Sequence, residues 1–186
     1  APHLVDDRLL LHFGAVDQDA VIFVDSTDVG RHSGGVLPFT VDVTDASGSI
    51  SVQVPRQWAN DVDAEGWQPP DEDAEFPALG VGASSGWSGS ESPAPGVFAA
   101  LLPGDDLPAR LPQHPECDSS RPPLSSGGAG TEAMTVVFTG CPGAPVTVER
   151  VQQVATNRLL WVQVRSDDEA TANRVLDEVR VHGLGS

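Results

Sequence analysis

The side chain that most resembles a reactive group is that of Ser84, which lies between two glycines, Gly82 and Gly86. Residues 82–86 match the GxSxG pattern of serine hydrolases, and acids and His182 follow in the chain order that those enzymes use. In that pattern the serine is the nucleophile and must stand on a strand-to-helix turn. Residues 87–95 are rich in serine, glycine and proline and cannot continue a helix. We therefore expect a loop without a catalytic residue, and a secreted serine hydrolase using Ser84 is the alternative.

A run of carboxylates forms the second candidate site. It follows an EF-hand register, with oxygen ligands at alternate positions, a glycine in the middle and a glutamate at the end: Asp61, Asp63, Glu65, Gly66 and Glu72. Prolines stand at the exit of this loop, and neither flank has a helical pattern. We expect a solvated acidic loop. The alternative is a weak calcium site, and a calcium-stabilised structural module, formed by Asp61, Asp63, Glu65 and Asp71 or Glu72.

Tryptophans and histidines complete the candidates. Trp67 and Trp87 lie in polar stretches and could line a ligand cleft, although loop tryptophans more often form a small cluster that covers the core. Trp161 lies in an apolar stretch and is expected in the core. The histidines share no spacing typical of metal ligands. The sequence thus predicts no catalytic residue and no cofactor, with calcium as the alternative.

The two cysteines, Cys117 and Cys141, flank a stretch rich in glycine, serine and proline. That stretch has too little apolar surface to order itself, so a disulfide would restrain it, removing roughly 3 kcal/mol of unfolded-chain entropy. Two buried free thiols are the alternative. Zinc is not indicated, because each cysteine stands alone and Pro115 prevents a helical presentation of His114 with Cys117.

Composition limits the class of partner. The chain has 186 residues, with 27 acidic residues, 10 basic residues that are all arginine, and a formal net charge of -17. Such a surface repels nucleic acid and anionic lipid at long range. No apolar run is long enough to span a membrane, and the first residues do not resemble a signal peptide. We expect an extracytoplasmic protein, secreted or at the cell surface, whose signal or membrane tether lies outside these residues.

The elements that must position these residues are mostly strands. Apolar runs and alternation predict strands over residues 20–24, 36–43, 49–54, 97–102, 134–139, 146–155, 159–165 and 179–182. Short links between the strands within 134–165 favour an antiparallel meander. Residues 61–95 are rich in proline, glycine, serine and acids, which predicts long loops.

One helix is expected from Asp167 to Glu178. Residues 166–169 read Ser-Asp-Asp-Glu, which predicts a capping box, and the apolar residues that follow have helical spacing: Ala172, Val175, Leu176 and Val179. This helix should pack its apolar stripe on the sheet. The predicted fold is a single α+β domain, an antiparallel sheet packed with one or a few helices and stapled by one disulfide.

Several short motifs occur in an order that resembles a known family. They are residues 48–55 followed by Trp58, residues 77–84, residues 95–98, the two cysteines, and residues 162–167 with Val175 and Leu176. In combination they are similar to the extracytoplasmic domains attached to actinobacterial serine/threonine protein kinases and trypsin-like membrane proteases. The resemblance implies a non-catalytic sensory or binding domain, tethered outside the membrane, with a fold similar to the Mog1/PsbP sandwich. It supplies no catalytic residues.

The resemblance also implies a domain organisation. Residues 47–183 would form the extracytoplasmic α+β domain, whereas residues 1–46 lie outside the resemblance. These N-terminal strands complete the same sheet or belong to a preceding element. The expected partner is an extracellular ligand or protein, with no nucleic acid and with the membrane reached only through a tether.

Overall fold

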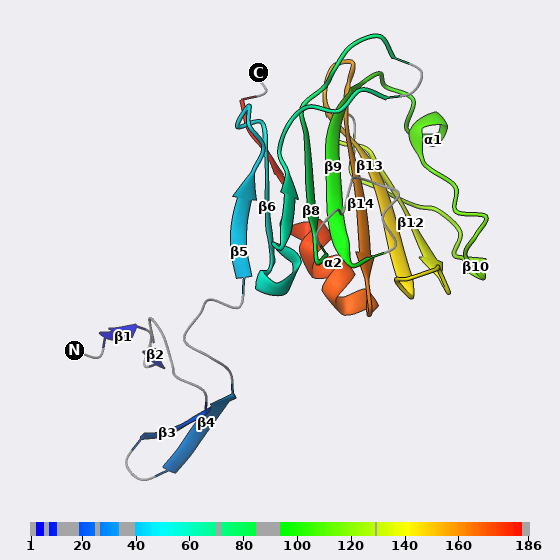
Figure 1. The fold of residues 1–186 in the computed structure, drawn as a ribbon. Helices are drawn as coiled ribbons and strands as arrows, with labels where there is room; N and C mark the ends of the chain where they lie inside the picture. Colours follow the sequence, from blue (N-terminus) through cyan, green and yellow to red (C-terminus); the bar gives the residue numbers. More distant parts are fainter. Residues whose placement is uncertain are drawn as a thin grey trace. The chain divides into compact units, whose positions relative to one another are not determined.

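The chain divides into two compact units, residues Ala1–Phe39 and Thr40–Ser186. The computed structural model describes residues 3–5, 8–10, 19–24, 27–33, 40–69, 72–84, 94–128 and 130–183 (Figure 1). In the first unit the described residues form two antiparallel pairs: β1 (His3–Val5) with β2 (Arg8–Leu10), and β3 (Asp19–Val24) with β4 (Thr27–Ser33). The strand predicted over residues 20–24 corresponds to β3.

The second unit is built on a large antiparallel sheet, in which the described strands follow the order β10-β12-β13-β14-β9-β8-β7, with β11 also paired to β12. Its strands are β7 (Asp61–Asp63), β8 (Ala78–Gly82), β9 (Gly96–Pro103), β10 (Ser119–Ser120), β11 (Leu124–Ser126), β12 (Ala133–Thr139), β13 (Val146–Ala155) and β14 (Arg158–Ser166). The consecutive strands β12, β13 and β14 form the antiparallel meander that their short links predict.

A second layer covers one face of this sheet. It consists of a small sheet in the order β15-β6-β5, together with helix α2. Their bounds are β5 (Thr40–Thr44), β6 (Ile50–Pro55), β15 (Arg180–Val181) and α2 (Glu169–Asp177). Buried side chains of β6 and α2 pack with those of β8, β9 and β14 in one hydrophobic core, to which the short helix η1 (Arg56–Trp58) adds Trp58. The fold is therefore broadly α+β, and sheet dominates it (Figure 1).

The opposite face of the large sheet carries a second core. Side chains alternate along β14, so Leu160, Val162 and Val164 join the first core while Leu159 and Trp161 join the second. The second core also holds Leu107 of the short helix α1 (Leu107–Arg110), which follows β9, and Leu111. Because both faces are covered, the central strand β14 is buried along almost its whole length.

The prediction of long loops over residues 61–95 is wrong in part, because β7 and β8 lie within this range. All five residues of β8 are buried, so the strand has no polar face and no alternating pattern. Two of the five are glycines, which made the segment resemble a turn in the sequence. Gly80 lies opposite the ring-bearing Phe98 of β9, and Gly82 lies opposite Gly96.

The segment between the cysteines is also more ordered than its composition predicts. Strands β10 and β11 pair with β12 through their backbones, although their side chains are exposed. Arg121 adds a bidentate ion pair to Glu169 in the first turn of α2, with both N···O distances 2.7 Å. Backbone pairing and this contact replace the apolar burial that the segment lacks.

The helix near the C-terminus forms as predicted, but its cap differs. The N-cap is Asp168, whose carboxylate accepts a hydrogen bond from the backbone amide of Thr171 at 2.8 Å. Ser166, which the capping box places at the start of the helix, is the last residue of β14. The helix therefore begins at Glu169, two residues later than expected, because the strand extends to Ser166.

Replacing a buried side chain of β8 tests whether this strand is part of the core. Leu79 is 1% exposed, and Leu79→Ala is expected to lower the free energy of unfolding by about 2–5 kcal/mol through lost burial and a cavity. Val62, on the neighbouring strand, is 46% exposed, so Val62→Ala should cost about 0.5 kcal/mol or less. Urea unfolding of both variants measures the difference, and equal effects would contradict the burial of β8.

Candidate functional site

The disulfide predicted from the sequence is present and joins Cys117 to Cys141. Cys141 is buried just after β12, whereas Cys117 ends a segment that crosses the second core. We call residues 111–117 the strap. One end of the strap is held by the buried side chain of Leu111 and the other by the covalent bond. His114 lies between these two anchors.

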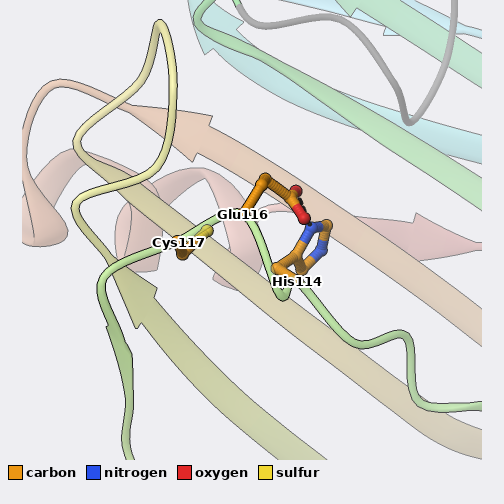
Figure 2. Close-up of side chains that lie close together, drawn as sticks. All are labelled: His114, Glu116 and Cys117. Atoms are coloured by element: carbon orange, nitrogen blue, oxygen red, sulfur yellow. Dashed lines mark hydrogen bonds and ion pairs between the residues drawn. The ribbon is translucent and has the colours of Figure 1, made fainter.

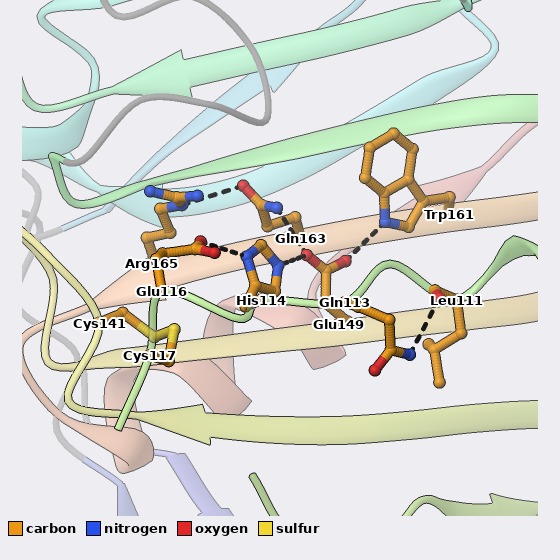
Figure 3. A network of polar contacts seen from close by, with 10 residues as sticks. All are labelled: Leu111, Gln113, His114, Glu116, Cys117, Cys141, Glu149, Trp161, Gln163 and Arg165. Carbon is orange, nitrogen blue, oxygen red and sulfur yellow. Dashed lines mark hydrogen bonds and ion pairs between the residues drawn. A yellow bond between two sulfur atoms is a disulfide. The ribbon is translucent and has the colours of Figure 1, made fainter. Parts of the chain in front are cut away.

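Beneath the strap, a glutamate side chain is fully buried in the sheet. Glu149 of β13 is 0% exposed and lies opposite Gln163 of β14. The indole Nε1 of Trp161 donates a hydrogen bond to its Oε2 at 2.6 Å, and Nε2 of Gln163 donates to its Oε1 (Figure 3). Trp161 and Gln163 are two residues apart on one strand, so the pleat directs both toward the same carboxylate.

The strap supplies the third donor to Glu149. Nε2 of His114 lies 2.7 Å from Oε1 of Glu149, and Nδ1 lies 2.8 Å from Oε1 of Glu116 (Figures 2 and 3). An ionised carboxylate can only accept hydrogen bonds, so with both glutamates ionised both ring nitrogens donate and the ring is an imidazolium. The ring also packs edge-on against Phe138, with centroids 4.8 Å apart.

These contacts shift the pKa values of His114 and Glu116. Burial alone would lower the pKa of His114, but the hydrogen bonds to Glu149 and Glu116 outweigh it and raise that pKa above the ordinary 6.5. The hydrogen bond from His114 in turn lowers the pKa of Glu116. The geometry and both directions favour the protonated form of His114 in the closed structure.

An arginine fixes the far end of the network. Nε of Arg165 donates to Oε1 of Gln163 at 3.1 Å. Because a guanidinium only donates, Gln163 must present its oxygen to Arg165 and its nitrogen to Glu149. Donation therefore runs from Arg165 to Gln163 and from Gln163 to Glu149, and His114 donates to Glu149 from the strap and also to Glu116 (Figure 3).

This cluster is not a metal centre, although its residue types resemble one. The donor atoms of His114, Glu116 and Cys117 lie within 4.8 Å of one another. The sulfur of Cys117 is bonded to Cys141, and both nitrogens of His114 point at carboxylates (Figure 3). No nitrogen or thiolate is left to bind an ion, so the cluster is a hydrogen-bonded ion network.

The residues of the predicted serine site are not assembled into a hydrolase arrangement in the described chain. Ser84 is exposed and follows β8, which pairs antiparallel with β9. A nucleophile turn leads from a strand into a helix, and residues 85–93, which follow Ser84, lie outside the described residues. Nε2 of His182 lies 2.7 Å from Oγ of Ser51, a contact that links β6 to the residue after β15.

The predicted calcium ligands are spread over different elements. Asp61 and Asp63 lie on strand β7, so the EF-hand register begins with a strand and not with a loop. The Asp63 carboxylate accepts from the amide of Glu65, and Glu72 pairs with Arg110 at 3.1 Å. Within the described residues, these carboxylates do not gather around a common point. Asp71 lies outside the described residues.

Of the two tryptophans predicted to line a cleft, Trp67 packs against the second core. Its ring centroid lies 5.3 Å from that of Phe98 and 5.5 Å from that of Trp161. It therefore occupies the covering position that the alternative interpretation gave to loop tryptophans. Trp87 lies outside the described residues.

The network itself was not predicted from the sequence. Its signal was the placement of polar residues at alternate positions inside long apolar strands, with Glu149 in β13 and Gln163 and Arg165 in β14. Buried polar residues of this kind require partners. The partner His114 lies in a proline-rich segment, and no local pattern connects it to the sheet.

Neither a comparison with protein-family models nor one with curated proteins found a match to this chain. In the described part of the chain, no helix is long and apolar enough to cross a membrane.

Removing the buried carboxylate tests the network. Glu149→Leu keeps a similar volume but leaves His114, Trp161 and Gln163 without their acceptor, so the free energy of unfolding should fall by about 3–5 kcal/mol. Glu178, 43% exposed at its side chain and paired with Arg180, is the matched control, and Glu178→Leu should cost about 1 kcal/mol or less. Equal losses in urea unfolding would show that the network contributes no more than a surface ion pair.

Proposed function

We propose that this chain is a non-catalytic extracytoplasmic domain that binds a ligand or partner protein and acts as the sensory part of a membrane-tethered signalling protein or protease. The observation that carries the proposal is the disulfide between Cys117 and Cys141. Such bonds form and persist mainly in oxidising compartments outside the cytosol. The bond also anchors the strap over the second core, so export and the architecture of this face are linked.

Three further observations support the proposal. The net charge of -17 favours a protein or small-molecule ligand over nucleic acid. Two histidines have structural partners: His114 pairs with two glutamates, and His182 contacts Ser51. The motif order that resembles extracytoplasmic domains of actinobacterial kinases and proteases supplies the proposed attachment and the proposed Mog1/PsbP-like fold.

Protease treatment of intact native cells tests the proposed location. An extracytoplasmic domain should be digested by added proteinase K while a cytosolic marker survives. In parallel, alkylation of acid-quenched cells should leave both cysteines unlabelled until a reductant is added. A domain that resists digestion until lysis, or that has two free thiols in the cell, would contradict the proposal.

A fluorophosphonate probe tests the absence of serine hydrolase chemistry. We expect no labelling at Ser84, because no base contacts this exposed serine within the described residues, and a serine without a positioned base is a poor nucleophile. Labelling of the natural chain that disappears in Ser84→Ala would overturn this expectation. Ser51→Ala is the matched control for the serine that contacts His182.

A further inference from the structure

We propose that the strap is a proton-operated latch, held on the sheet face while His114 is an imidazolium and released as that proton is lost. The device would belong to the domain wherever the domain is located, so it does not depend on the proposed function. Its basis is the position of His114 between two carboxylates, that of Glu116 on the strap and that of Glu149, which is buried on the sheet.

The groups that face the imidazole come from every element around it. Glu116 lies on the strap, Glu149 lies on β13, and the ring of Phe138 comes from β12. From β14, Arg165 acts electrostatically on Glu116 and is linked to Glu149 through Gln163. Two acceptors therefore contact the ring directly. The cation Arg165 reaches the ring only indirectly, through its effect on Glu116 and through Gln163 and Glu149.

Loss of the proton leaves the closed arrangement unsatisfied. One ring nitrogen would then present a lone pair to a carboxylate that can only accept. The His114 side chain is 8% exposed and that of Glu149 is 0% exposed, so water has little access to either while the strap is closed. A buried carboxylate that loses a charged donor incurs a large desolvation penalty. Opening the strap admits water and removes that penalty.

The sign of the pH dependence follows from the direction of the shift. The pKa of His114 is raised in the closed structure above its ordinary value of 6.5, so closure binds the proton more tightly. The stabilisation is complete below that ordinary value and is lost as the pH rises through the raised pKa. Each unit between the closed and open pKa values changes the closing equilibrium by about tenfold.

The disulfide at Cys117 and the buried side chain of Leu111 limit how far the strap can move when it opens. The disulfide keeps Cys117 attached to the end of β12, so the strap swings away without leaving the domain. The strap covers a face that includes Phe138 and Trp161, which are 3% and 7% exposed in the closed structure. Loss of the proton would therefore expose the ring of Phe138, against which His114 packs edge-on in the closed structure.

Hydrogen exchange measured by NMR between about pH 5.5 and about pH 9 tests the latch, because this range brackets histidine titration. Two protons report on it: the Cys117 amide, bonded to the His114 carbonyl at 3.2 Å, and the indole Nε1–H of Trp161. After correction for intrinsic exchange, their protection should fall by about tenfold or more with rising pH, which corresponds to at least one pKa unit. Protection of the Val162 amide in the sheet centre should stay constant.

Variants separate the latch from general unfolding. In His114→Gln the protection of the two reporter protons should no longer change with pH, whereas His182→Gln, which alters a histidine at the small sheet, should titrate like the natural chain. A flat profile in the natural protein overturns the proposal even if His114→Gln fails to fold. Loss of protection at Val162 together with the strap would also overturn it, because it would report unfolding of the whole domain.

Discussion

The rest of this structure depends on the fully buried carboxylate of Glu149. A carboxylate without solvent contact is tolerated only where donors replace water, and here three N–H groups do so. Two come from Trp161 and Gln163, whose positions are set by the register of β13 with β14. The third comes from His114, which reaches the sheet only because the strap lies across it. The sheet register and the strap position are thus coupled through one side chain.

The two cores differ in composition, since one is apolar and the other adjoins the polar network. The face that carries α2 and β6 is apolar and holds residues such as Val52, Val164 and Val175. The opposite face mixes aromatic side chains with the polar row, and its cover is a short helix, the strap and the segment that carries Trp67, not a second layer of sheet. Because a loop cover has few backbone bonds to the sheet, a side-chain network and a disulfide can control it.

Most regular elements could be predicted from the sequence because their patterns are local. Alternation placed β6 and β13, and the spacing of Ala172, Val175 and Leu176 placed α2. Strand β8 was missed because burial on both faces removes alternation and its glycines favour a turn interpretation. The network could not be predicted, since the contact between His114 and Glu149 spans 35 positions and no motif connects them. Among the described residues, the first two carboxylates of the calcium pattern lie on strand β7 and not in a loop between helices. The residues that follow Ser84 in the serine pattern lie outside the described chain.

The protonation state of the His114 ring tests the central claim most directly. A long-range proton–nitrogen correlation spectrum of the folded, disulfide-bonded chain, recorded near the ordinary histidine pKa of about 6.5, reports each ring nitrogen separately. We expect both nitrogens of His114 to be protonated there, with the titration midpoint at higher pH, because both face carboxylates. An unprotonated ring nitrogen, or a midpoint below the ordinary value, would contradict the imidazolium bridge between Glu116 and Glu149.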